Sequence, residues 1–135
     1  MERSLHWKLS AAAATAVPVG ALMIPWLLQA CDGLLPTTMG GAVPMRCTYT
    51  YRVEFGLALV ALAVGGALLW LSSREARRMG GGVLALLGAL IAAVPQRWLI
   101  GTCRGGTCHS GGLWFAIAGV FLLLMGAQSA VLARE

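Results

Sequence analysis

The sequence predicts an all-α membrane protein, and its composition, its apolar runs and the placement of its basic residues support this prediction. Apolar residues make up 59% of the 135 residues, charged residues make up 11%, and the mean hydropathy is +0.79. Soluble domains carry roughly 25% charged residues. A small soluble domain cannot bury this much apolar surface, because a large share of its surface stays exposed. We therefore expect the chain to lie in a lipid bilayer.

Four apolar runs are each long enough to cross a bilayer as a helix. A helix needs ~20 apolar residues to span ~30 Å of hydrocarbon, and it satisfies every backbone polar group internally. The runs are Leu9–Ala30, Val53–Leu71, Val83–Ile100 and Leu113–Leu132. We expect a single domain over residues 1–135, with one helical hairpin over about 7–71, a basic connector over 72–80 and a second hairpin over about 81–132.

The two hairpins resemble each other at corresponding positions. Trp26 stands five residues before Cys31, and Trp98 stands five residues before Cys103. A proline lies just upstream of each tryptophan, and each hairpin has a second cysteine before its second helix. This pattern predicts two tandem helical hairpins related as a parallel internal repeat, with an axis along the membrane normal.

The basic residues predict the orientation of the chain. Five residues, Arg74–Arg78, form a short and strongly basic connector, and such connectors favour the cytoplasm. Both termini are then cytoplasmic, and both cysteine loops face outward. The net charge of +5 is explained by arginines at the ends of apolar runs. No basic stripe alternates with aromatic residues, so we expect no nucleic-acid partner.

The four cysteines then lie on the outer side, where disulfides persist. Four cysteines allow three connectivities. The scheme within loops joins Cys31 to Cys47 and Cys103 to Cys108, and we favour it because few residues separate the second pair. A crossed scheme joins Cys31 to Cys103 and Cys47 to Cys108.

Thiol redox chemistry is the alternative role for these cysteines. Two outward cysteine pairs on four helices resemble the plan of the quinone-linked disulfide-forming membrane oxidases. In those enzymes a Cys-x-x-Cys spacing helps to stabilise the reactive thiolate. Here four residues separate Cys103 from Cys108, and Arg104 is the cation that would lower a thiol pKa.

Three further interpretations concern single segments of the loops. The first interpretation is a metal site formed by loop residues. Thioether and thiolate sulfurs suit Cu(I), and a mixed set of cysteine and histidine suits zinc. The candidate ligands are Met39, Met45, Cys47, Cys108 and His109. The order of residues from Cys103 to His109 is a looser relative of the covalent haem motif. The segment Leu28–Cys31 resembles a lipoprotein cleavage site. None of them matches its standard pattern, so we expect no metal and no other cofactor.

Charged residues are predicted at the outer membrane interface. Glu54 opens the second apolar run, and Arg52 and Arg97 lie at a similar depth. Residues two apart on a helix do not face each other, so we expect Glu54 to pair with Arg97 of the other hairpin and Arg52 to point toward the head groups. The three residues together are a candidate polar site beneath the loops.

The segment Met45–Gly56 carries a resemblance to a known family. Its order is methionine, a basic residue and cysteine, then an aromatic residue, then Arg-x-Glu. It resembles a family of small bacterial and archaeal four-helix membrane proteins with two outward cysteine-pair loops, catalogued as a domain of unknown function. Relatives carry a histidine where this chain has Thr48 and a tryptophan where it has Tyr49.

The resemblance implies a location and a partner. Relatives are often encoded beside ABC transporters of the macrolide-exporter type, and the membrane is the bacterial or archaeal plasma membrane. The chain has no nucleotide-binding loop and no Ser/His/Asp array in its sequence. We therefore expect a non-catalytic accessory subunit of a larger membrane complex, stapled by disulfides and in contact with lipid. The alternative is a membrane thiol-disulfide oxidoreductase using Cys103 and Cys108.

Overall fold

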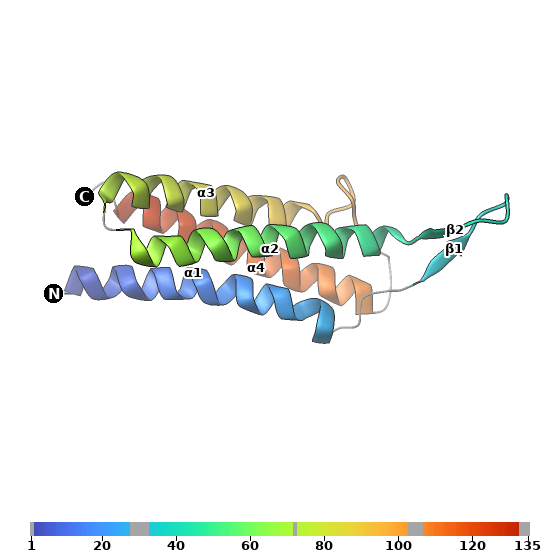
Figure 1. Cartoon of the computed structure of the whole chain (residues 1–135), viewed down its shortest axis with the longest axis horizontal. Helices are drawn as coiled ribbons and strands as arrows, with labels where there is room; N and C mark the ends of the chain where they lie inside the picture. Colours follow the sequence, from blue (N-terminus) through green and yellow to red (C-terminus); the bar gives the residue numbers. More distant parts are fainter. Residues whose placement is uncertain (1, 28–32, 72, 103–106, 133–135) are drawn as a thin grey trace.

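The described residues form four helices and one small β-hairpin (Figure 1). The computed structural model describes residues 2–27, 33–71, 73–102 and 107–132, without the side chains of residues 2–7, 10, 11, 107 and 108. The helices are α1 (Glu2–Leu27), α2 (Arg46–Trp70), α3 (Arg74–Ala93) and α4 (Thr107–Leu132). The strands are β1 (Leu34–Pro36) and β2 (Ala42–Pro44), and they pair in antiparallel orientation.

The helices run alternately up and down, so that both ends of the described chain lie at one end of the bundle (Figure 1). Each helix contacts two neighbours: α1 packs on α2, α2 on α3, α3 on α4, and α4 returns to α1. We call the opposite end the loop end. It holds the β1–β2 hairpin, the first turns of α2 and α4, and the turns that follow α3.

Among the described residues, three helical segments are long and apolar enough to cross a membrane. They are α2, α3 and residues His109–Leu132 of α4, whereas α1 contributes the shorter apolar stretch Ala12–Leu27. The fold is therefore the expected all-α class, with the helices of a multi-pass membrane protein. The fourth span and the internal repeat stay predictions.

Helix α3 begins and ends earlier than its apolar run. The run was Val83–Ile100, but the helix covers Arg74–Ala93, so the basic connector forms the first turns of α3. The hydroxyl of Ser73 accepts a hydrogen bond from the N–H of Ala76 at 3.3 Å, which caps the helix. The helix stops before Pro95, because proline has no N–H with which to continue the helical hydrogen bonds.

Glycines bring α3 and α4 into backbone contact. A Cβ on Gly119 of α4 would stand 2.6 Å from the carbonyl oxygen of Gly88, and one on Gly126 would stand 2.6 Å from that of Gly81. No side chain fits between the helices at either point. Small residues allow this close approach, which helix pairs in lipid need because lipid supplies little hydrophobic driving force between helices.

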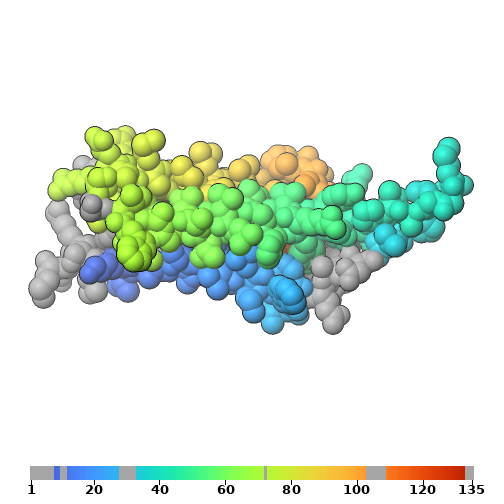
Figure 2. All heavy atoms as spheres, viewed as in Figure 1, coloured from blue at the N-terminus to red at the C-terminus, as the bar shows by residue number. Residues whose placement is uncertain are grey.

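The β1–β2 hairpin stands clear of the bundle at the loop end (Figure 2). Its register pairs Leu35 with Val43, and its turn is closed by a hydrogen bond of 2.7 Å from the N–H of Thr37 to the carbonyl of Gly41. Gly40 adopts the left-handed φ of +79° that the turn requires, which glycine does without steric cost. This hairpin was not predicted from the sequence.

Candidate functional site at the loop end

A stripe of polar side chains is buried on one face of α2 at the loop end. Cys47, Thr50, Tyr51 and Glu54 follow one another at spacings of one, three or four residues and are all buried. These are positions i, i+3, i+4 and i+7, which share one face of a helix. Further along the same face the buried residues are apolar or glycine. The buried face of α2 is therefore partly polar at the loop end and without polar side chains further along.

Thr50 links α2 to the turn that precedes α4. Its hydroxyl donates a hydrogen bond of 2.7 Å to the carbonyl of Gly101, and its side chain is 1% exposed. Gly101 has a φ of +79°, and its own N–H donates to the carbonyl of Val94 at 3.3 Å. The buried polar stripe is therefore hydrogen-bonded to the turns that follow α3.

Tyr51 packs against the first turns of α4. Its ring meets that of Phe115 edge to face, with centroids 5.6 Å apart and planes at 70°, a favoured geometry for aromatic pairs. Its hydroxyl lies directly against Gly111 and has no hydrogen-bond partner among the described residues. A larger residue at Gly111 would displace Tyr51.

Glu54 is the most unusual residue of the stripe. It is 0% exposed, and neither carboxylate oxygen has a hydrogen-bond partner within the described part of the chain. Arg52 and Arg97 are both exposed, and neither is hydrogen-bonded to the Glu54 carboxylate in the structure. A buried polar group without a partner costs about 1–3 kcal/mol, and ionisable residues inside membrane bundles typically mark functional sites.

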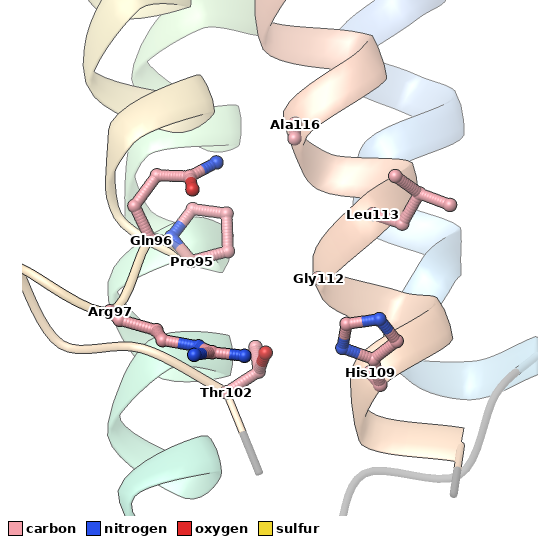
Figure 3. A pocket seen from close by; sticks show the side chains of 8 residues that line it. All are labelled: Pro95, Gln96, Arg97, Thr102, His109, Gly112, Leu113 and Ala116. Atoms are coloured by element: carbon pink, nitrogen blue, oxygen red, sulfur yellow. The ribbon is translucent and has the colours of Figure 1, made fainter. Parts of the chain in front are cut away.

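An open pocket lies beside this stripe, between α4 and the turns after α3 (Figure 3). Its volume is about 610 Å³, and its polar lining residues are Gln96, Arg97, Thr102 and His109. Figure 3 shows the Arg97 side chain reaching toward Thr102, with the His109 ring opposite on α4. Pro95, Leu113 and Ala116 supply an apolar floor.

Two neighbouring glycines of α4 separate the pocket from the buried stripe. Gly111 faces Tyr51, whereas Gly112 faces the pocket wall, where a Cβ would stand 2.6 Å from Cγ2 of Thr102. The pocket and the stripe thus share the start of α4 and the Gly101–Thr102 turn. Arg97 and His109, which the sequence placed in two different interpretations, line one pocket here.

The structure places one of the four cysteine side chains. Cys47 is fully buried in the first turn of α2, with 0% of its surface exposed. Cys31 and Cys103 lie outside the described residues, as does the side chain of Cys108. Both disulfide schemes therefore stay predictions, and so does redox activity of Cys103 and Cys108.

The candidate metal ligands of the first loop are spread along the hairpin. Met39 lies at its tip and is 97% exposed, whereas the side chain of Met45 packs against Gly33 at its base. Cys47 is buried in α2. Within the described residues, no three His, Cys, Asp or Glu side chains are grouped so as to hold a metal ion.

Sequence reasoning missed the buried roles of Thr50 and Tyr51. Tyr51 is 5% exposed, whereas Tyr49, two positions earlier, is 50% exposed. The signal was present, because positions 47, 50, 51 and 54 share one face of any helix that begins before Cys47.

Comparison with known proteins identifies the chain at the level of a family. No curated protein and no solved structure matches it. A family model described as a domain of unknown function, DUF4418, matches residues 13–132, which include most of α1 and all of α2, α3 and α4. The chain therefore belongs to the DUF4418 family.

Proposed function

We propose that the protein is a non-catalytic accessory subunit that contacts a larger membrane complex through its β1–β2 hairpin. The observation that carries the proposal is the apolar surface of a hairpin that stands clear of the bundle. Leu34 is 61% exposed, Leu35 50% and Val43 49%, and the hairpin projects beyond the helices (Figure 1).

An isolated two-stranded hairpin is marginally stable in water. This one holds its shape through its turn and through its base, where the N–H of Met45 donates a hydrogen bond of 3.2 Å to the carbonyl of Gly33. Exposed apolar side chains on a projecting element are typical of a protein-protein contact. Its unpaired strand edges are also able to accept a strand from a partner.

The family resemblance suggests the class of partner. If the partner is an ABC-type transporter of the macrolide-exporter kind, its contact surface would lie outside the membrane, on the side where we place the hairpin. The buried polar stripe and the glycine contacts between α3 and α4 would then build a rigid base for the hairpin. Structural disulfides among the loop cysteines would secure the same end of the bundle.

The alternative, a thiol-disulfide oxidoreductase, makes a different demand on the cysteines. A reactive thiol is partly exposed and lies in an electropositive environment. The complete burial of Cys47 suits a structural role for that residue. For Cys103 and Cys108, a reduction potential below about −300 mV would indicate a structural disulfide, and a much higher potential would indicate a catalytic one.

Co-purification tests the proposed function. The tagged chain, extracted in mild detergent, should retain a membrane-protein partner, and Leu35→Asp should abolish this retention while the bundle keeps its thermal stability. Thr38→Asp is the matched control, because it adds the same charge at the turn of the hairpin without removing an apolar side chain. Equal retention by the wild type and Leu35→Asp would contradict a hairpin-mediated contact.

A further inference from the structure

We propose that the pocket between α4 and the turns after α3 binds the phosphodiester head group of an anionic phospholipid. This inference is independent of the hairpin and of any protein partner. It rests on the position of the pocket, on the donors that line it, and on the apolar floor that continues into the span of α4.

We expect the pocket to lie at the depth of the lipid head groups. His109 is the first residue of the membrane-span segment of α4, and Arg97 follows the end of α3 by four positions. Both side chains are exposed. The positive charge of Arg97 attracts a phosphodiester anion, and its guanidinium matches a phosphate by offering two parallel N–H donors.

The lining combines these donors with an apolar path toward the bilayer. Arg97 and Thr102 face His109 across the opening (Figure 3). Below His109, the pocket is lined by Leu113 and Ala116, which lie four and seven residues further along and therefore on the same face of α4. A head group held by Arg97 would place its first acyl methylenes on these two residues.

Gly112 lets the start of α4 pack closely against the pocket wall. A Cβ at this position would stand 2.6 Å from Cγ2 of Thr102 and 3.4 Å from Cβ of Pro95. The start of α4 therefore lies close to the turn that carries Thr102, and the volume of about 610 Å³ remains available in front of it. This volume lies in the range of pockets that hold small-molecule ligands.

Native mass spectrometry of the full chain released from nanodiscs tests the assignment. Phosphatidylglycerol should bind more tightly than phosphatidylcholine, and Arg97→Gln should weaken phosphatidylglycerol binding at least about tenfold, as expected for the loss of a hydrogen bond to a charged group. Arg97→Lys should retain part of the affinity. Because Arg97 is exposed, its substitution should leave thermal unfolding unchanged.

Arg52→Gln is the matched control, since Arg52 is an exposed arginine of the same end that does not line the pocket. Equal binding of the two lipids, or an equal loss in both arginine variants, would overturn the proposal. A last measurement adds inorganic phosphate as a competitor. If millimolar phosphate displaces phosphatidylglycerol and itself binds in an Arg97-dependent way, the site is one for a free phosphate, and the lipid assignment is wrong.

Discussion

The hydroxyl of Thr50 donates a hydrogen bond of 2.7 Å to the carbonyl oxygen of Gly101, joining two segments that are 51 positions apart. This bond holds the first turns of α2 against the Gly101–Thr102 turn. The same turn forms one wall of the pocket that Arg97 lines. The geometry of the loop end therefore depends on a buried contact between the two halves of the chain.

Thr50→Val should reduce the free energy of unfolding by about 1–3 kcal/mol, because it keeps the shape of the side chain but leaves the Gly101 carbonyl without its donor. Thr50→Ser should restore most of this loss. Unfolding by denaturing detergent in mixed micelles measures the difference. Equal stability of the valine and serine variants would show that the hydrogen bond contributes nothing.

Gly119→Ala should destabilise the bundle by about 1–3 kcal/mol, since the added methyl group meets the backbone of α3 and forces the helices apart. Gly82→Ala is the matched control, because a Cβ at Gly82 meets nothing within 4 Å and alanine favours the helix. The same unfolding assay compares the two. A loss of stability in Gly82→Ala as large as that in Gly119→Ala would contradict the observed packing.

Glu54→Met should leave the isolated protein as stable as the wild type, or stabilise it by about 1–3 kcal/mol, because it removes a buried polar group that has no partner within the described residues. Glu75→Gln, at an exposed position in the first turn of α3, controls for the loss of a carboxylate. If Glu54→Met instead destabilises the protein by several kcal/mol, the carboxylate has a partner in the folded protein.

The helical framework could be predicted from the sequence, because helices that face lipid need an apolar composition and long apolar runs. The position of α3 did not. Its apolar run included Trp98 and Leu99, which belong to the turns after the helix, and excluded the basic residues Arg74–Arg78, which are helical. Hydropathy alone cannot distinguish an apolar turn at the membrane interface from the end of a helix. The capping residue Ser73 and the helix-ending residue Pro95 are the local signals that mark the two ends of α3.

The candidate site was predicted in part. Glu54, Arg97 and His109 were each identified as chemically unusual, but their partners depend on helix rotation and on the path of the turn after α3. Arg97 lies in the turns after α3, where its exposed side chain lines the pocket, whereas Glu54 is buried on α2. The β1–β2 hairpin was missed because its strands are three residues long and carry prolines, which weaken any strand signal.

The orientation is tested by labelling single cysteines in intact cells. An impermeant maleimide should label Met39→Cys, because Met39 is 97% exposed at the hairpin tip and is predicted to lie outside. Arg78→Cys, in the basic first turns of α3, should stay protected until the membrane is permeabilised. Background labelling of the native cysteines is measured on the unmodified protein. Labelling at position 78 in intact cells would reverse the predicted topology.

Photo-crosslinking from Met39 in the native membrane tests the proposed accessory role most directly. A benzoylphenylalanine at this position should give a discrete adduct that is larger by one membrane-protein subunit, and Leu35→Asp should abolish that adduct. The same probe at Trp70, which is 89% exposed at the opposite end of the bundle, should not give it. An identical set of adducts from both positions, or none from Met39, would contradict the account.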